Sequence, residues 1–189
     1  MRERIRSRIV TRICRLLPAR VARRFVRQQE GAAAVEFALV ALPFLALLFA
    51  ILETALVFFA GQTLEAAVAQ AGRLIMTGQA QTAGFSQANF KTQVCNDLSG
   101  GLFDCAASLY VDVKTYSSFA AVNTASPITN GQFDSSKLGW TPGGPGDIVV
   151  VTLYYQWPIY VSLLGNNLAN LGNASRLLVA TSVFRNEPY

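Results

Sequence analysis

Hydrophobic residues dominate one long run near the start of the chain, from Phe37 to Ala60, which only Pro43, Glu53 and Thr54 interrupt. In helical form this run is long enough to cross the roughly 30 Å hydrocarbon core of a bilayer. Beyond it, apolar residues recur three and four positions apart, which is typical of an amphipathic helix. These positions are Leu64, Ala67, Val68, Ala71, Leu74 and Ile75. The pattern predicts one helix over 32–77, with its first half in a membrane and its second half presenting an apolar stripe to a soluble head.

After the long helix the pattern breaks into shorter elements, which indicates a small head. A serine at Ser86 precedes apolar residues four apart and predicts a short capped helix. Alternating apolar and polar residues predict a half-buried strand at 109–116. The strongest strand pattern is at 147–158, where one face is apolar and Pro158 ends the strand, and a third strand is predicted from Ser175 on. The segment 117–146 is rich in Ser, Asn, Gly and Pro and predicts a long loop or a pair of turns. Because no crossover helix is long enough for parallel strands, we expect an α+β fold whose long helix covers a roughly three-stranded antiparallel sheet.

The charges are divided unevenly along the chain and favour one orientation in a membrane. Residues 1–30 carry ten arginines against Glu3 and Glu30, whereas residues 31–189 carry six basic and nine acidic side chains. An excess of arginine beside a spanning helix marks its cytoplasmic end, so the segment after about residue 60 is expected outside the cytoplasm. The apolar composition, 52% hydrophobic against 14% charged, also favours a membrane protein.

Two carboxylates at the ends of this apolar segment need an explanation, because an ionised side chain in hydrocarbon costs roughly 2.5 to 3.5 kcal/mol. Glu53 lies about 32 Å along the helix from Ala32, so we expect it near the outer interface with its carboxylate reaching water. Glu36 lies about one turn inside the inner interface and calls for a partner. A glycine, Gly31, separates Glu36 from the arginines.

The arginine-rich N-terminus fits an ordinary secretory signal poorly, since its basic region is long and the apolar run exceeds the usual roughly 7 to 15 residues. The pair Arg23-Arg24 lies in a tail that is basic throughout, so it does not stand out as a twin-arginine signal. Isoleucines at helical spacing among the arginines instead predict a helix lying on the anionic inner leaflet. Only Phe25 places an aromatic ring among the charges, and no nucleic-acid partner is expected.

The cysteines agree with an exported head. Cys95 and Cys105 bracket "CNDLSGGLFDC", in which Gly100 and Gly101 allow a tight return, whereas Cys14 lies alone on the cytoplasmic side. A structural disulfide between Cys95 and Cys105 is therefore predicted, and two free buried thiols are the alternative. Without histidine and without C-x-x-C spacing, no metal site is expected.

The pattern does not indicate an enzyme. The chain has no histidine to act as the usual general base, and no glycine-rich phosphate loop follows a strand. Five aspartates stand singly in the head and are expected to be solvated or turn residues: Asp97, Asp104, Asp112, Asp134 and Asp147. No catalytic residue, metal ligand or cofactor is predicted.

Four features together resemble the TadE-like family, the minor pseudopilins of the tight-adherence (Tad) pilus. They are "GAAAVEFALVALPFLALLFAILETALVFF", the following "LEAAVAQAGRLIMTGQ", the cysteine pair before "LYVDVKTY", and "VFRNEPY". The resemblance extends over residues 31–189, and its most specific parts are the junction from glycine to Glu-Phe and the terminal "RNEPY". It implies a pilin-like long N-terminal helix on a small α+β head.

The resemblance also implies a processing site formed by Gly31, Ala32, Glu36 and Phe37. A membrane-embedded prepilin peptidase would cut between Gly31 and Ala32 and remove the basic leader on the cytoplasmic side. The new ammonium group at Ala32 would lie at the edge of the hydrocarbon, where Glu36 is a fitting partner within the chain or from a neighbouring subunit. The alternative is that Glu36 reaches the inner interface in an uncut protein.

The resulting expectation is a minor pseudopilin that serves as a structural or assembly subunit of a Tad-type pilus machine. Its divisions would be a cytoplasmic leader (1–31), a transmembrane half-helix (32–60), a periplasmic half-helix (61–78) and a periplasmic head (79–189). Its partners would be the prepilin peptidase, other pseudopilins and pilus subunits, and membrane lipid. It would cross the bacterial inner membrane once, in the platform or incorporated in a pilus. The alternative is an uncut single-pass protein with a periplasmic scaffold or binding domain.

Overall fold

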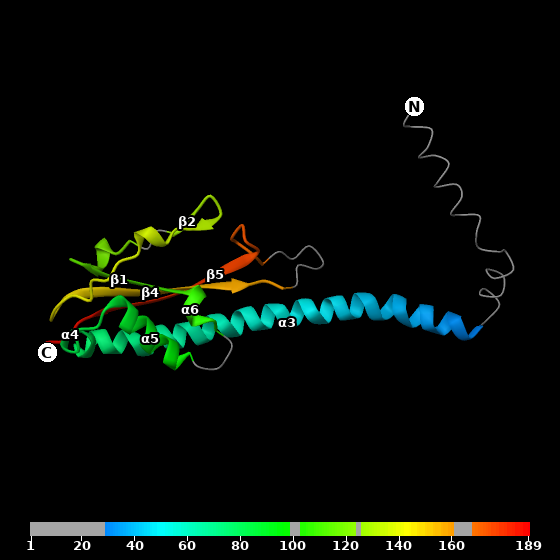
Figure 1. Cartoon of the computed structure of the whole chain (residues 1–189), viewed down its shortest axis with the longest axis horizontal. Coiled ribbons are helices and arrows are strands. Elements are labelled where there is room, and N and C mark those ends of the chain that lie inside the picture. Colours follow the sequence, from blue (N-terminus) through cyan, green and yellow to red (C-terminus); the bar gives the residue numbers. More distant parts are fainter. Residues whose placement is uncertain (1–28, 99–102, 124–125, 161–167) are drawn as a thin grey trace, which may run out of the picture. The chain divides into compact units, whose positions relative to one another are not determined.

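The computed structural model describes residues 29–98, 103–123, 126–160 and 168–189 (Figure 1). The chain divides into two units, Met1–Leu48 and Phe49–Tyr189, and each is described by itself. The amphipathic helix expected among the N-terminal arginines falls outside the described residues.

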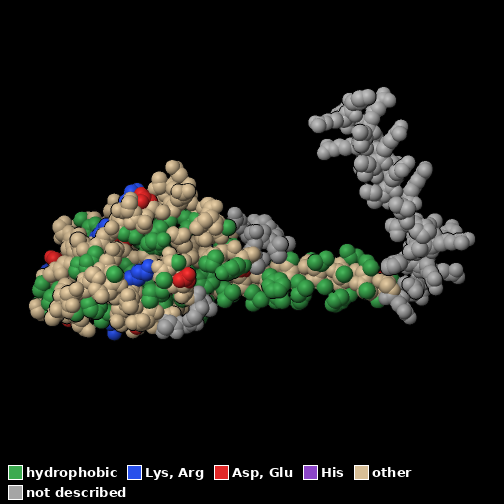
Figure 2. Space-filling view, in the orientation of Figure 1, with side chains coloured by type: hydrophobic (Ala, Val, Ile, Leu, Met, Phe, Trp, Pro, Cys, Tyr) green, Lys and Arg blue, Asp and Glu red, His purple; other side chains and the backbone are tan. Residues whose placement is uncertain are grey.

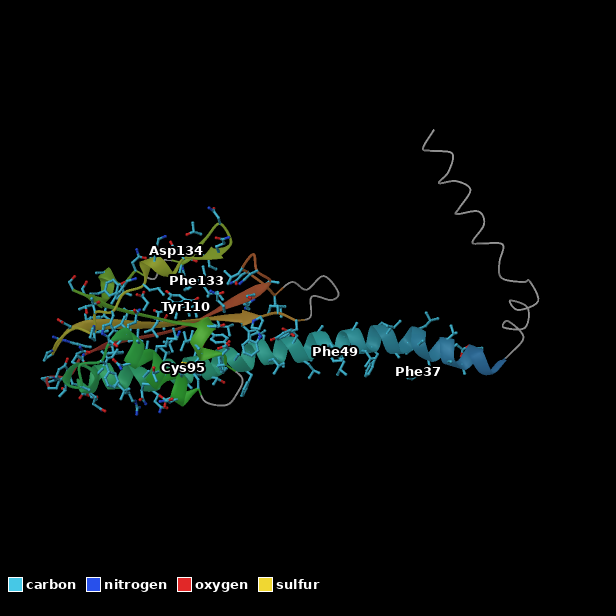
Figure 3. All side chains as sticks on the ribbon, in the orientation of Figure 1. Phe37, Phe49, Cys95, Tyr110, Phe133 and Asp134 are labelled. Atoms are coloured by element: carbon cyan, nitrogen blue, oxygen red, sulfur yellow. A yellow bond between two sulfur atoms is a disulfide. The ribbon has the colours of Figure 1, made fainter. Side chains whose placement is uncertain are left out.

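Helix α3 (Gln29–Met76) begins in the first unit and ends in the second. In the first unit its large apolar side chains are exposed, and Phe37 is 75% accessible. An 18-residue window of this helix has a mean hydropathy of 2.6 and none of it is buried, so length and composition suit a membrane span. The side chains of Phe37 and Phe49 project outward from the helix (Figure 3), and hydrophobic groups follow its visible face (Figure 2). One apolar helix near the N-terminus suggests a single-pass membrane protein.

In the second unit α3 buries the predicted apolar stripe. Its fully or nearly fully buried members are Val57, Ala60, Leu64, Ala67, Val68, Ala71 and Ile75, at spacings of three and four that bring them to one side of the helix. They share one hydrophobic core with the central sheet. The helix stops at Met76 because Gly78 adopts a left-handed backbone with φ of 75° and its amide donates to the Ile75 carbonyl at 3.0 Å.

Three short helices follow: α4 (Gln79–Thr82), α5 (Gln87–Asp97) and α6 (Cys105–Ser108). The predicted cap of α5 is present, since the Ser86 side chain accepts from the Asn89 amide and the Asn89 side chain accepts from the Ser86 amide. Phe90 and Val94 on α5 are completely buried. The short helix expected after Ser86 is thereby confirmed.

The central sheet has three antiparallel strands in the order β1-β4-β5. They are β1 (Leu109–Tyr116), β4 (Ile148–Pro158) and β5 (Ser175–Arg185). Figure 1 shows the sheet lying along the C-terminal part of α3, with α5 on the same side of the sheet as α3. The predicted α+β fold, with its long helix, short helix and three-stranded antiparallel sheet, is confirmed.

Both faces of β4 are buried, whereas only one of them was predicted as an apolar face. One face, from Val149 through Val151, Leu153, Tyr155 and Trp157, packs in the core with α3. On the other face Val150, Thr152 and Tyr154 are at most 7% exposed.

The segment 117–146 supplies much of the cover on that second face. It contains the two-stranded hairpin β2 (Ile128–Thr129) and β3 (Gln132–Phe133) and the 3-10 turns η1 (Phe119–Ala121) and η2 (Ser135–Lys137). The ring of Phe133 lies 4.7 Å from that of Tyr110 and 5.5 Å from that of Tyr154, and Figure 3 shows Phe133 above Tyr110. The segment read as a loop is therefore a structured second layer.

Candidate functional site

The four residues of the expected processing junction lie in the first turns of α3. Gly31, Ala32, Glu36 and Phe37 are all helical and all exposed. Helix geometry places positions 32 and 36 on the same face, with Cβ atoms about 5 to 6 Å apart. Among the described residues, none forms a hydrogen bond or ion pair with the Glu36 side chain. The carboxylate is thus available to a group that the described part of the chain does not supply.

Neither packing nor backbone geometry requires a glycine at position 31. A Cβ atom added there meets nothing within 4 Å, and the same is true at Gly61 in the same helix. Neither residue is among the glycines with positive φ. Glycine inside a helix costs about 1 kcal/mol relative to alanine. At Gly72, by contrast, an added Cβ would lie 3.0 Å from the Phe184 ring, so packing explains that glycine.

Glu53 is placed differently from the expectation. It is 6% exposed, and its carboxylate Oε1 accepts a hydrogen bond from the backbone amide of Tyr160 at 3.3 Å. It lies four residues before Val57, on the same stripe as the buried apolar residues. The expectation of a water-facing carboxylate was wrong, because Ile159 and Tyr160, directly after β4, help to cover this turn of the helix.

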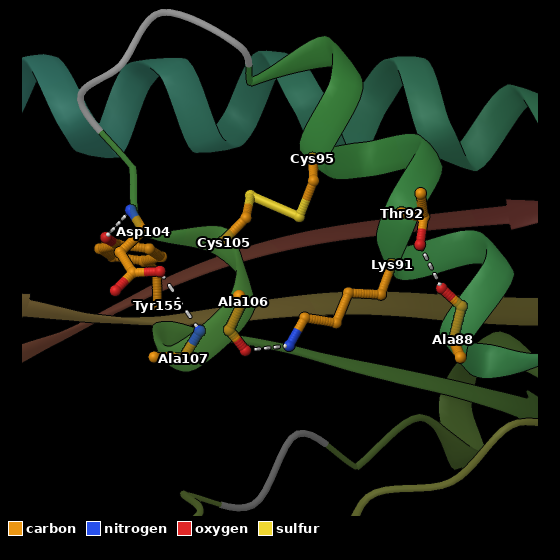
Figure 4. The surroundings of a disulfide bond; sticks show 9 residues. All are labelled: Ala88, Lys91, Thr92, Cys95, Asp104, Cys105, Ala106, Ala107 and Tyr155. Carbon is orange, nitrogen blue, oxygen red and sulfur yellow. Dashed lines mark hydrogen bonds between the residues drawn. A yellow bond between two sulfur atoms is a disulfide. The ribbon is translucent and has the colours of Figure 1, made fainter.

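Cys95, near the end of α5, and Cys105, the first residue of α6, form a disulfide with Cα atoms 5.7 Å apart (Figure 4). This lies within the usual spacing for a disulfide and agrees with the expected pairing. Lys91 on α5 also donates to the Ala106 carbonyl at 3.0 Å, and the Asp104 amide donates to the Tyr155 hydroxyl at 2.8 Å. The disulfide therefore links α5 to a turn that is already attached to β4.

We expect a thiol reagent to modify Cys14 but neither Cys95 nor Cys105 when the full-length protein is unfolded without reductant. Cys14 provides the internal positive control in the same sample. Replacing both head cysteines with alanine should lower the free energy of unfolding of the head by about 2.5 to 3 kcal/mol, since the crosslink closes a short loop. Labelling of all three cysteines before reduction would exclude the disulfide.

The "RNEPY" motif fastens the end of α3 to the turn before β4. The buried Asn186 side chain donates to the carbonyls of Pro142 and Gly144, both at 3.0 Å. The Glu187 amide donates to the Met76 carbonyl at 2.9 Å, and the Tyr189 ring packs where a side chain at position 78 would lie. Sequence reasoning singled out this motif by resemblance, and the structure shows that its contacts are internal to the head.

The aspartates of the head mostly cap turns. Asp104 caps α6, and Asp134 accepts from the Ser136 hydroxyl and amide, which lower the pKa of the Asp134 carboxyl. Asp112 departs from the expected solvated role, since it is 8% exposed, pairs with Lys114 at 2.8 Å and accepts from the Gly139 amide at 2.7 Å. Within the described ranges no group of three or more His, Cys, Asp or Glu side chains is placed to hold a metal ion.

Comparison with known proteins finds a similarity within α3. A family model described as TadE-like protein matches residues 31–73. Over this segment the chain is similar to TadE-like proteins. The match begins at Gly31 and includes Glu36, Glu53 and most of the buried stripe, so the resemblance inferred from the sequence is confirmed there. No curated protein and no solved structure matches the chain.

The TadE-like family brings the Tad pilus as its context and is structural rather than catalytic. The similarity suggests interaction with other Tad pilus components. The matched residues belong to α3, and the head from α4 onward lies outside them.

Proposed function

We propose that this chain is a minor pseudopilin of a Tad-type pilus machine. A prepilin peptidase cuts it between Gly31 and Ala32, and the mature chain acts as a structural or assembly subunit. The observation that carries the proposal is Gly31, a helical glycine that nothing in the described chain requires, at the first residue of the TadE-like segment. A residue that weakens its own helix and makes no contact is explained if an enzyme recognises it.

The cut would create a charge that needs a partner. The α-ammonium of Ala32, with an ordinary pKa near 8, would lie at the edge of the hydrocarbon, where an unpaired charge is costly. Glu36 is exposed and carries the opposite charge one helical turn away. Pairing with the amine of a neighbouring subunit would fix the register of two helices, which supports a role in assembly.

The charges and the disulfide support the placement in the cell. The arginine-rich segment before α3 favours a cytoplasmic N-terminus, and the disulfide favours an oxidising compartment for the head. These features support an inner-membrane protein with a leader (1–31), a membrane half-helix (32–60), a periplasmic half-helix (61–78) and a periplasmic head (79–189).

An uncut single-pass protein with a binding or scaffold head is the second candidate. The observation in its favour is a groove of about 160 Å³ between the second face of the sheet and the segment 117–146, lined by Asp112, Lys114 and Tyr154 among others. Burial raises the pKa of the Tyr154 hydroxyl above its ordinary value.

N-terminal sequencing of the protein extracted from membranes tests the choice. Expression beside an active prepilin peptidase is expected to give a chain that begins at Ala32, and expression without the peptidase should give the full-length chain. If only full-length chain is recovered with the active peptidase, the pseudopilin proposal fails and the uncut alternative stands.

A further inference from the structure

The turns of α3 between residues 52 and 60 have two contrasting faces. Glu53, Val57 and Ala60 are at most 7% exposed because the head covers them. On the other faces of the same turns, four large apolar side chains are 45% to 70% exposed: Leu52, Leu56, Phe58 and Phe59. At this level along its axis, the helix is therefore covered by the head on one face and exposes an apolar surface on the others.

The polar groups on these turns have hydrogen-bond partners within the chain. The Thr54 hydroxyl donates to the Ala50 carbonyl at 2.8 Å, and the Glu53 carboxylate accepts the Tyr160 amide. The first exposed polar side chain beyond them is Gln62, which reaches the exposed Glu65 at 3.4 Å. A helix surface whose polar groups are paired internally is suited to hydrocarbon. The surface suited to lipid thus continues past Glu53 to about Ala60.

Glu53 then lies about 10 Å inside the end of the lipid-suited surface, since seven residues of helix separate it from Ala60. A carboxylate at that depth needs cover, and the end of the head provides it. Val57 and Ala60, between Glu53 and Gln62, belong to the same core as Trp157, with Ile159 and Leu168 packed against it. The head therefore covers one face of α3 at turns whose other faces already expose apolar side chains.

We infer that the end of the head formed by residues 157–160 enters the outer interface of the bilayer and that Tyr160 contacts lipid there. Tyr160 is 79% exposed, although its own backbone amide is held by the buried Glu53. Tyrosine is enriched where membrane and water meet, because its ring is apolar and its hydroxyl is polar. Leu56, Phe58 and Phe59, which are exposed on the other faces of α3 near this level, would lie in the same interface.

The opposite arrangement places the membrane boundary at Glu53 and the head wholly in water. It leaves Leu56, Phe58 and Phe59 in water on one side of the helix. It also gives no reason for covering a carboxylate that water would solvate. The inference requires that α3 spans the membrane, but it does not require removal of the leader. Every residue that it uses lies beyond position 49.

A depth measurement in lipid nanodiscs tests the inference. Tyr160→Cys, Phe58→Cys and Ser136→Cys are made separately in a Cys14→Ser chain and labelled with an NBD fluorophore, with the Cys95–Cys105 disulfide left oxidised. Tyr160 is a suitable site because its ring is exposed and its contact with Glu53 uses the backbone. Phe58 serves as the lipid-facing control, and Ser136, exposed in η2, serves as the head control.

We expect lipids with a quencher near the headgroup to quench the label at position 160 at least about twofold more strongly than the label at 136, and nearly as strongly as that at 58. Iodide in the aqueous phase should give the reverse order. If positions 160 and 136 behave alike with both quenchers, or if position 58 is as open to iodide as position 136, the head does not enter the interface. Recovery of only uncut chain would remove the proposed function and leave this measurement unchanged.

Discussion

Gly31→Leu is expected to leave the arginine-rich leader on the chain, whereas Gly61→Leu is expected to leave processing intact. Both glycines lie in α3 with no atom within 4 Å of an added Cβ, so both changes fit the folded chain. Leucine is also a better helix former than glycine, so neither change should weaken the helix. A difference between the two variants therefore reports on recognition at position 31.

The measurement is the fraction of membrane-bound protein that has the mature mass, in cells with an active prepilin peptidase. We expect Gly31→Leu to lower the cleavage rate by at least about tenfold, which corresponds to about 1.4 kcal/mol of lost transition-state stabilisation. Mature protein at the wild-type rate from Gly31→Leu, or an equal loss from Gly61→Leu, would contradict recognition of this glycine.

Glu36→Gln and Glu36→Leu are expected to lower the recovery of partner pseudopilins sharply while leaving insertion and cleavage intact. Either change would leave the Ala32 ammonium of a neighbouring subunit without its counter-charge in a poorly hydrated site. A loss of about 1 to 3 kcal/mol, allowing for nearby water, corresponds to an affinity about 5- to 150-fold weaker. Affinity purification at equal membrane levels of each variant measures the effect, and pilus output should fall with it.

Glu53→Gln is the matched control, because it removes the other carboxylate of the same helix. An amide oxygen can still accept the Tyr160 amide that now bonds to Glu53 at 3.3 Å, so the head should remain in place. We expect partner recovery close to that of the wild type. Equal recovery from Glu36→Gln and Glu53→Gln would overturn the pairing of Glu36 with a neighbour.

The elements of the fold could be predicted because local patterns determine them. The stripe on α3 repeats at three and four residues, the Ser86 cap precedes α5, and the strands alternate or run apolar. The second cover of β4 was missed because the segment 117–146 has the composition of a loop. A signal was nevertheless present, since the continuous apolar run in "DIVVVTLYY" is typical of a strand buried on both faces.

Glu53 was misplaced because distance along the helix was considered without its direction around the helix. Four residues before Val57, it continues the stripe that the head buries, and extending the predicted stripe toward the N-terminus would have found this. Asp112 was missed for another reason. Its cover comes from Gly139, which is 27 residues away in the chain. No spacing in the sequence shows that contact.

The long interval in sequence between α3 and the strands that cover it affects how the protein is made. The stripe ends at Ile75, but β4 and β5, which share its core, are complete only at Arg185. At about 5 to 20 residues per second, synthesis of the roughly 110 intervening residues takes about 5 to 20 s. Throughout that interval Leu64, Val68 and Ile75 have no sheet to cover them. The protein is therefore most prone to aggregation while the helix has been made and the sheet has not.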